Sequence, residues 1–307
     1  MDVDVGVDDA LAIVLATRSP ELDLQAITTV SGNVHVDQTT LNSLKVLEAI
    51  GKPEIPVAKG LSKPLEREFE VGDDYHGKDG LGDSNLPSPR ILVDGRHAVD
   101  LLVEETRANP KGITVVATAP LTNIAAAILR DRDFTRRVQE LVIMGGAYAV
   151  TPFGYGNMNP VAEFNIYVDP EAASIVFKSG IPITAVGLDV TTDPEARLCK
   201  ELYQTMVEAR GPVPKFAALI TKRLMTRDGF MYLHDPIAVA VAADPTLVTT
   251  REYHVDVETL SSLTRGQTVA DRRERLPESS KQRPNAKICT NINGGHFLKL
   301  FMDRVAC

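Results

Sequence analysis

An acidic run opens the 307-residue chain and is its first candidate for chemistry. Asp2, Asp4, Asp8 and Asp9 lie within eight residues, around Gly6. Carboxylates crowded in this way need raised pKa values or a cation, and oxygen-only ligands select Ca²⁺ or Mg²⁺, with Ca²⁺ accepting the larger and less regular shell. One or two Asp residues here would be interpreted as caps of a helix. Four of them favour a site for a hard cation.

Two other interpretations of this run can be tested against the residues. An EF-hand loop beginning at Asp2 needs Gly at its sixth position and Glu at its twelfth, where the chain has Val7 and Ile13. A phosphatase of the DxD type would use Asp2 as nucleophile and Asp4 as acid, but it requires Thr or Val where Gly6 stands. The EF-hand is excluded, and the DxD phosphatase remains the alternative enzyme class.

Three further polar stretches could supply catalytic groups. His234 and Asp235 stand just before an apolar helical pattern, and His76 lies in a glycine-rich stretch. Residues 157–165 read NMNPVAEFN. Taken singly, each stretch is typical of a helix cap, a turn or a solvated histidine. Together with the acidic run they indicate one common site.

The motifs resemble one enzyme family along nearly the whole chain. The run DVDVGVDDALAIVLA resembles the DxDPGxDDA signature of the inosine–uridine-preferring nucleoside hydrolases. In family order follow ITTVSGNV, HGKDGLG, VVATAPLTNIA, VIMGGAY, NPVAEFNIYVDPEAA, VGLDVT, LHDP and TRGQTVAD. The resemblance implies a calcium-dependent hydrolase with an α/β, Rossmann-like fold that converts ribonucleosides to free base and ribose.

The resemblance also implies a role for individual residues. The expected Ca²⁺ ligands are Asp4, Asp9, Asp235 and the backbone carbonyl of Thr118. Asp4 is expected to be the base that takes a proton from a Ca²⁺-bound water, and His234 to assist the departing nucleobase. The substrate-binding residues implied in this way are Asp8, Asn33, Asn157, Glu163 and Asn165 at the ribose hydroxyls, Met144 near the sugar, and His76 and Phe164 near the base.

The residue types suit this chemistry by themselves. Cleavage of an N-glycosidic bond develops positive charge on the ribose, as in glycosidases, and carboxylates around the ring stabilise that charge. A bound Ca²⁺ lowers the pKa of its water, and a histidine has the pKa to protonate a leaving base near neutrality. A catalytically silent nucleoside-binding protein is the other alternative, but every catalytic position holds a competent residue.

The chain departs from the family pattern in ways that bear on the pocket. Val5 replaces the usual Pro, and only Met1 precedes Asp2, which predicts a first strand that is nearly absent. The loop 147–156 is longer than expected and borders the ribose site. The chain has no Trp, which disfavours the stacking used by purine-specific relatives. We expect the stretch 216–232 to supply the wall of the base pocket, with Phe216, Arg227, Phe230 and Tyr232 as candidates.

The pattern of elements that must position these residues is strand, turn and amphipathic helix, repeated. It predicts one α/β domain over residues 1–307, with a mostly parallel central sheet flanked by helices and with C-terminal helical and β additions. The predicted strands of the sheet include 22–30, 56–58, 113–117, 141–144 and 183–186. Ligands of such sheets bind at the carboxyl ends of the strands, where the polar clusters stand. The loop-like segment 62–90 is expected to be a lid.

Composition excludes several classes of protein. A formal charge of −8 argues against nucleic-acid binding, and the longest apolar runs are too short to span a membrane. The acidic start predicts no signal peptide, and three Cys residues (199, 289 and 307) without CxxC spacing predict reduced thiols in a cytoplasmic protein. The expected partner is a small ribonucleoside, and the resemblance implies a homodimer or homotetramer.

Overall fold

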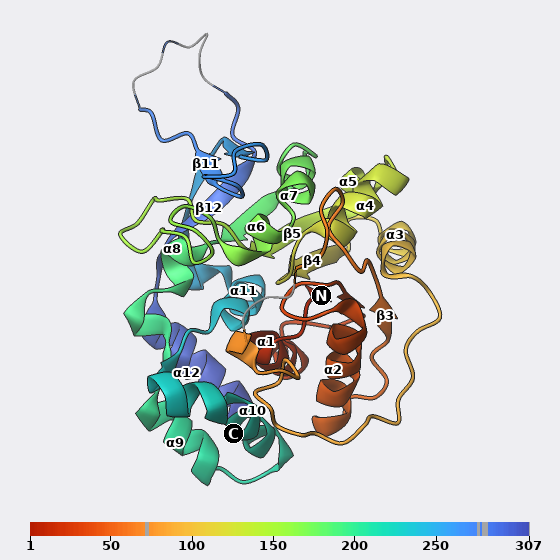
Figure 1. The fold of residues 1–307 in the computed structure, drawn as a ribbon, viewed down its shortest axis with the longest axis vertical. Helices are drawn as coiled ribbons and strands as arrows, with labels where there is room; N and C mark the ends of the chain where they lie inside the picture. Colours follow the sequence, from red (N-terminus) through yellow and green to blue (C-terminus); the bar gives the residue numbers. More distant parts are fainter. Residues whose placement is uncertain (71–73, 275–276, 278–281, 307) are drawn as a thin grey trace.

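The predicted α/β architecture is present in the computed structural model, which describes residues 1–70, 74–274, 277 and 282–306. In this part of the chain, eight strands form one sheet in the order β3-β2-β1-β4-β5-β6-β12-β9 (Figure 1). Their bounds are β1 Asp2–Val3, β2 Ile27–Thr29, β3 Val57–Lys59, β4 Ile113–Ala117, β5 Val138–Met144, β6 Ile183–Val186, β9 Val248–Tyr253 and β12 Ala286–Ile292. Neighbours pair in parallel as far as β12, and β9 pairs with β12 antiparallel.

The strand order places a switch point between β1 and β4. From β1 the chain builds outward through β2 to β3, then returns to add β4 on the other side of β1 and continues through β5 and β6. The loops after β1 and β4 therefore leave the sheet in opposite directions, which opens a crevice at the carboxyl ends of these two strands. Asp4 follows β1 and Thr118 follows β4, so both stand at this crevice.

Helices cover both faces of the sheet and bury two separate apolar cores (Figure 1). The first face carries α1 Val7–Thr17, α2 Val36–Ala49, α10 Pro212–Asp228, α11 His234–Ala243 and α12 Gly294–Val305. The second face carries α3 Ala98–Ala108, α4 Thr122–Arg130, α5 Phe134–Arg137 and α7 Pro170–Phe177. The short helices α6 Phe164–Val168, α8 Leu188–Thr191 and α9 Lys200–Glu208 lie between these layers or at their edge.

The helix α1 is buried along nearly its whole length, which explains its composition. Residues 7–16 are all buried, and the helix packs against α2, α10, α11 and α12 and shares a core with strand residues such as Val3 and Ile27. A helix enclosed on all sides is apolar all round, except where its first turn carries Asp8 and Asp9. The two carboxylates therefore project from a rigid, fully packed element into the crevice.

The strand predicted over 22–30 is longer than the strand in the structure. The first strand, β1, has only two residues, as expected. The prediction of a strand over 22–30 is wrong for residues 22–26, because β2 spans only Ile27–Thr29. Its partner β1 pairs with it from Asp2 onward, so the residues before Ile27 have no neighbouring strand to extend along. Between them and β4 lies a cavity of about 510 Å³ that Met1, Ala26 and Val115 help to line.

The C-terminal additions and the predicted lid also have defined structure. The hairpin β10 Val255–Val257 and β11 Thr268–Ala270 and the pair β7 Leu198–Cys199 and β8 Phe230–Met231 stand apart from the main sheet. The segment 62–90 is mostly loop, with the 3₁₀ turn η1 at Asp74–His76; its residues 71–73, like Cys307, lie outside the described part. None of the helices in that part is long and apolar enough to cross a membrane.

Candidate active site

A pocket of about 480 Å³ opens at the carboxyl ends of β1, β4 and β5, at the switch point of the sheet. All the predicted site residues line it except Asp4 and Asp9, which are fully buried beside it. The predicted residues in its lining are Asp8, Asn33, His76, Thr118, Met144, Asn157, Glu163, Phe164, Asn165, His234 and Asp235. Segments that are far apart in the sequence thus converge on one cavity.

Three buried carboxylates meet where two helices begin. Asp8 and Asp9 lie in the first turn of α1, and Asp235 lies in the first turn of α11, which packs against α1. One oxygen from each of these carboxylates lies within 4.8 Å of one oxygen from each of the others. Helix N-termini favour negative charge, so the two helix starts offset part of the repulsion. This arrangement brings Asp8, predicted at the ribose, into the same group as two predicted metal ligands.

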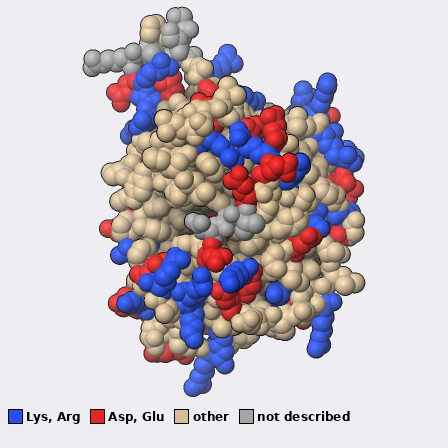
Figure 2. Space-filling view, in the orientation of Figure 1, with Lys and Arg blue, Asp and Glu red and all other residues tan. Residues whose placement is uncertain are grey.

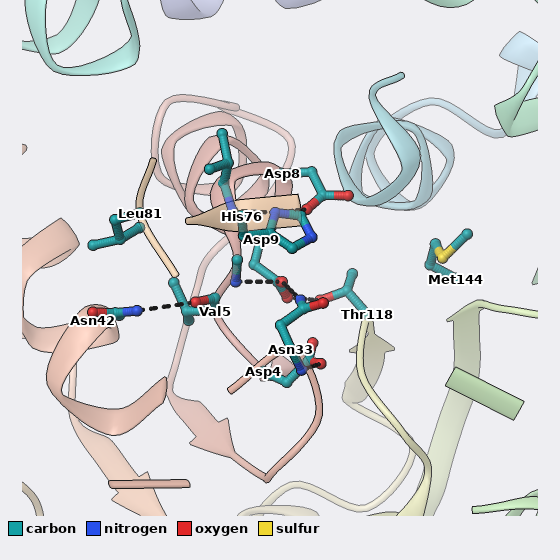
Figure 3. A network of polar contacts seen from close by, with 12 residues as sticks. Asp4, Val5, Asp8, Asp9, Asn33, Asn42, His76, Leu81, Thr118 and Met144 are labelled. Atoms are coloured by element: carbon teal, nitrogen blue, oxygen red, sulfur yellow. Dashed lines mark hydrogen bonds and ion pairs between the residues drawn. The ribbon is translucent and has the colours of Figure 1, made fainter. Parts of the chain in front are cut away.

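Asp9 is oriented by three donors. Its Oδ2 accepts the backbone N–H of Gly6 at 2.9 Å and Nδ2 of Asn33 at 3.3 Å, and its Oδ1 accepts the hydroxyl of Thr118 at 2.8 Å (Figure 3). The contact with Gly6 is the return half of a capping box at the start of α1. The local sequence that starts the helix therefore also fixes this carboxylate.

Asp4 has one oxygen occupied and one oxygen free. Its Oδ2 accepts the backbone N–H of Asn33 at 2.6 Å, whereas its buried Oδ1 receives no hydrogen bond from any described residue. Oδ1 of Asp8 is in the same condition, with the ring of His76 3.7 Å away. Buried oxygens without donors are costly unless a ligand satisfies them. Two such oxygens at one site are what a bound cation requires.

The electrostatics of the group point in the same direction. Burial, together with the charge of Asp8, raises the pKa of Asp9 to about 7. Burial also raises the pKa of Asp4 and of Asp235 well above the usual range, and the neighbouring carboxylates raise both further. Each carboxylate thus makes ionisation of the next less favourable. A divalent cation would reverse this effect, so the donor set fits a hard metal ion.

Asp2, the first residue of the acidic run, does not belong to this group. Its Oδ1 accepts the Thr28 hydroxyl at 2.6 Å and Asn123 Nδ2 at 2.8 Å. It therefore ties β1 to the neighbouring strand β2 and to the helix α4, and it does not line the pocket. The expectation that all four carboxylates would serve a cation and a ribose is wrong for this one, because Thr28 and Asn123 engage its carboxylate away from the pocket.

The opposite wall of the pocket is built by α6. Glu163 caps this helix: Oε1 accepts the N–H of Asn165 at 2.8 Å, and Oε2 accepts those of Gly146 at 2.9 Å and Ile166 at 3.2 Å. Burial nevertheless raises the pKa of Glu163 to about 7. Nδ2 of Asn165 donates to the carbonyls of Thr118 and Met144, both at 3.1 Å. Asn165 thus joins the β4 and β5 ends of the crevice.

Two histidines stand at the rim, each with a defined partner. Nδ1 of His76 accepts the N–H of Val7 at 3.1 Å, so the neutral ring carries its proton on Nε2. Nδ1 of His234 lies 2.8 Å from the hydroxyl of Thr191. Burial lowers the pKa of both rings, while the nearby charge of Asp8 raises it. Neither histidine is free to turn without losing a hydrogen bond.

Part of the pocket wall follows from the sequence and part does not. Of the four candidates from 216–232, Phe230 and Tyr232 line the pocket, but Phe216 is packed in the core and the guanidinium of Arg227 lies over the ring of Tyr75. Those two candidates are therefore wrong as pocket-lining residues. The lining residues not foreseen are Tyr75, Tyr155, Met158, Thr192 and Asp228. Tyr75 and Met158 each adjoin a predicted site residue, which is a signal that could have found them.

Figure 2 shows a hollow near the centre of one face of the molecule, and acidic and basic side chains are interspersed around it. No single-sign basic face of the kind that binds phosphate backbones is present among the described residues on this side.

Comparison with known proteins gives one result over the whole chain. The profile of the family described as inosine-uridine preferring nucleoside hydrolase matches residues 1–299. The chain is 40% identical over 313 residues to the pyrimidine-specific ribonucleoside hydrolase RihA of Shewanella sp. (strain ANA-3), covering 100% of this chain and 95% of that protein. It is also 40% identical over 312 residues to RihA of Citrobacter koseri, covering 99% and 96%.

Solved structures agree with this result. A plant nucleoside hydrolase, PpNRh1, superposes with a TM-score of 0.90 at 32% identity, covering 100% of this chain and 98% of that chain. A purine-preferring ribonucleoside hydrolase from Gardnerella vaginalis superposes with a TM-score of 0.90 at 36% identity, covering 99% and 96%.

Proposed function

This chain belongs to the inosine-uridine preferring nucleoside hydrolase family and hydrolyses ribonucleosides to a free base and ribose; on that premise we propose how its residues divide the work. Membership of this metal-dependent family leaves the DxD phosphatase and the silent binding protein without support. The observation that carries the proposal is the buried group of Asp8, Asp9 and Asp235 at the switch point of the sheet, together with the free oxygens of Asp8 and of the neighbouring Asp4.

We propose that the metal is Ca²⁺ and that Asp4, Asp9, Asp235 and the carbonyl of Thr118 hold it. Asp9 and Asp235 already form a compact oxygen cluster with Asp8, which is close enough to contribute an oxygen. Asp4 lies outside that cluster but near it, and it offers a buried Oδ1 that no described residue satisfies. An all-oxygen donor set of several carboxylates and a carbonyl suits Ca²⁺, which accepts a larger shell than the strictly octahedral Mg²⁺. When bound, the cation would lower the pKa of a water molecule at the site and offset the charge of the carboxylates. Asp4, whose carboxylate is oriented by the backbone N–H of Asn33, would then accept the proton of the attacking water.

The ribose lies between the carboxylate group and α6. Asn33, Asn157, Asn165 and Glu163 offer donors and acceptors to its hydroxyls, and Glu163 is held rigidly by its three backbone donors. Carboxylates on this side of the ring stabilise the positive charge that develops as the N-glycosidic bond breaks. Met144 supplies the apolar contact below the sugar.

The base leaves toward the histidines. His234, oriented by Thr191, assists the departing base, and His76 binds beside it with Nε2–H as the free donor. Phe164, Phe230 and Tyr232 supply the apolar faces on which the base packs. The absence of Trp, the presence of both histidines and the 40% identity to pyrimidine-specific relatives support uridine and cytidine as the preferred substrates. Cytoplasmic location and assembly into a homodimer or homotetramer stay predictions from sequence.

The test is ribose release from uridine, cytidine, inosine, adenosine and guanosine, with phosphate release from phosphorylated sugars measured alongside. We expect turnover of the two pyrimidine nucleosides to exceed that of the purine nucleosides. Asp4→Asn abolishes turnover, whereas Asp2→Asn, two residues away and bound to Thr28 and Asn123 instead of the carboxylate group, keeps it. Full activity of Asp4→Asn in calcium, with a folded protein by calorimetry, would overturn the assignment of the base.

A further inference from the structure

The wall of the pocket that carries His76 is a compact loop, residues 74–83, which we call the Tyr75 loop. It is closed on itself by backbone hydrogen bonds: Gly77 N–H to Asp74 C=O at 3.1 Å, Gly80 N–H to Gly77 C=O at 3.1 Å and Gly82 N–H to His76 C=O at 2.7 Å. These bonds fix the shape of the loop. Its far end is placed on the body by Leu81, which is buried in the core, and by the Asp79 carbonyl, which accepts Nδ2 of Asn42 at 2.8 Å. The end that carries Tyr75 and His76 is placed by other contacts.

The helix α10 supplies two of these contacts from one of its faces. Arg223 binds both ends of the loop: Nη1 lies 2.8 Å from Oδ2 of Asp83, and Nη2 donates to the carbonyl of Asp74 at 3.2 Å. Arg227 stands four residues later, and thus on the same face of the helix. Its guanidinium carbon lies 4.8 Å from the centre of the Tyr75 ring.

The guanidinium of Arg227 is itself oriented. Nε and Nη2 donate to the carboxylate of Asp228 at 3.0 and 2.7 Å. Asp228 lines the pocket, so the planar group is held between a pocket residue and the face of Tyr75. A planar, delocalised cation can stack on a ring and keep a two-point contact with a carboxylate, whereas a lysine ammonium cannot do both.

From Tyr75 the contacts continue to the site. The Tyr75 and His76 rings pack edge to face, with their centres 4.9 Å apart. Nδ1 of His76 accepts the N–H of Val7, the first residue of the helix that carries Asp8 and Asp9. Arg227, Tyr75 and His76 thus form one continuous set of contacts from the end of α10 to the start of α1.

We propose that Arg227 is a positioning residue for substrate binding: by stacking on Tyr75 it holds the Tyr75 loop, and with it His76, against the nucleobase. Arg227 touches neither the ribose nor the reacting bond. The inference rests on the proposed place of His76 beside the base. It assigns to the end of α10 a specific function in the pocket, although Arg227 does not line it.

The effect is expected in KM rather than in kcat. Arginine–aromatic contacts at half-exposed sites change a binding equilibrium by about two- to five-fold. Arg227→Ala should raise KM for uridine by about that factor and leave kcat within about a factor of two, because the carboxylate group is untouched. Arg227→Lys, which keeps the charge but not the planar stack, should restore KM only in part.

A matched control exists in the chain. Arg265 stacks on Tyr167 at 4.2 Å, on the side of α6 away from the Tyr75 loop, and neither residue lines the pocket. Arg265→Ala therefore removes the same kind of contact without touching that loop. Its KM should equal that of the wild type, and calorimetry should give similar melting temperatures for the two alanine variants. In a double-mutant cycle with Tyr75→Leu, the two effects on KM should not add, because each variant breaks the same contact.

The outcomes separate this inference from the proposed function. If His76→Ala leaves KM unchanged, the proposed place of His76 fails, and with it the premise. If His76→Ala raises KM but Arg227→Ala does not, or if the cycle is additive, Arg227 has no positioning role. A rise in KM for Arg265→Ala as large as for Arg227→Ala would reduce the effect to general destabilisation and also overturn the inference.

Discussion

The most direct test of the site geometry is a single methyl group at Gly32. A Cβ added to Gly32 would fall 2.7 Å from Cγ of Asp4, closer still to its Oδ2, and 2.9 Å from Cδ of Pro120. The backbone of Gly32 lies outside the left-handed region, so alanine fits its conformation without strain. Gly32→Ala therefore acts on its neighbours, and above all on the Asp4 carboxylate.

The size of the effect follows from these distances. Non-bonded carbon atoms rest at roughly 3.5–4.0 Å, so the carboxylate must move by about 1 Å. That displacement breaks the 2.6 Å hydrogen bond from the backbone of Asn33, and hydrogen bonds to charged groups contribute about 1.5–3 kcal/mol. A misplacement of about 1 Å at a catalytic group costs roughly 10²-fold in rate. We expect kcat/KM of Gly32→Ala to fall by about that factor, with a loss of stability of at most about 3 kcal/mol.

The assay is ribose release from uridine in saturating calcium, with calorimetry of the same samples. Gly95→Ala is the control, because a Cβ there meets no atom within 4 Å among the described residues, and its activity should equal that of the wild type. If Gly32→Ala retains wild-type kcat/KM while folding normally, the placement of Asp4 does not control the reaction, and the reasoning above is refuted.

Three other predictions concern stability. Calcium at about a hundredfold excess over its Kd should add about 2.7 kcal/mol to the free energy of unfolding, and Asp9→Asn should lose this increment in calorimetry. Burial raises the folded-state pKa of Glu163 from 4.5 to about 7, so its contribution to stability is complete below pH 4.5 and is lost as pH rises to 7. The free energy of unfolding of the metal-free wild type should therefore fall by at most about 3 kcal/mol across that window, measured in urea against Glu163→Gln. An extension of three apolar β-branched residues before Met1 should raise the melting temperature by filling the 510 Å³ cavity, whereas a Gly-Ser-Gly extension should not.

The sequence was sufficient for the order and type of the elements because the periodicities are strong. The strands 113–117 and 183–186 are found with the predicted bounds, and the acidic run does lead into a buried helix. It was insufficient where an element depends on a partner. Residues 22–26 have the apolar content of a strand, yet they lie beside the place where β1 has not yet begun, so no ladder can form.

The extent of a strand, which the sequence alone did not give, also determines the different positions of the carboxylates in the acidic run. Asp2 and Asp4 are two residues apart, a spacing that puts both on one face of a continuous strand. The strand ends between them, so Asp2 stays in the sheet with Thr28 and Asn123 while Asp4 turns into the crevice. Residue type predicted a cation site, but the assignment of each carboxylate depended on where one strand stops.

The aromatic candidates of α10 and β8 show what local pattern cannot decide. Phe216 and Phe230 are alike in type, and both stand near the pocket in sequence. Phe216 lies on the face of α10 that packs into the core, whereas Phe230 follows Gly229, whose φ of +77° ends the helix and redirects the chain along the pocket wall. The turn at Gly229 also leaves Arg227 on the last turn of α10, over Tyr75 rather than over the substrate. One left-handed glycine therefore determines which side chains of this segment line the pocket and which lie over Tyr75.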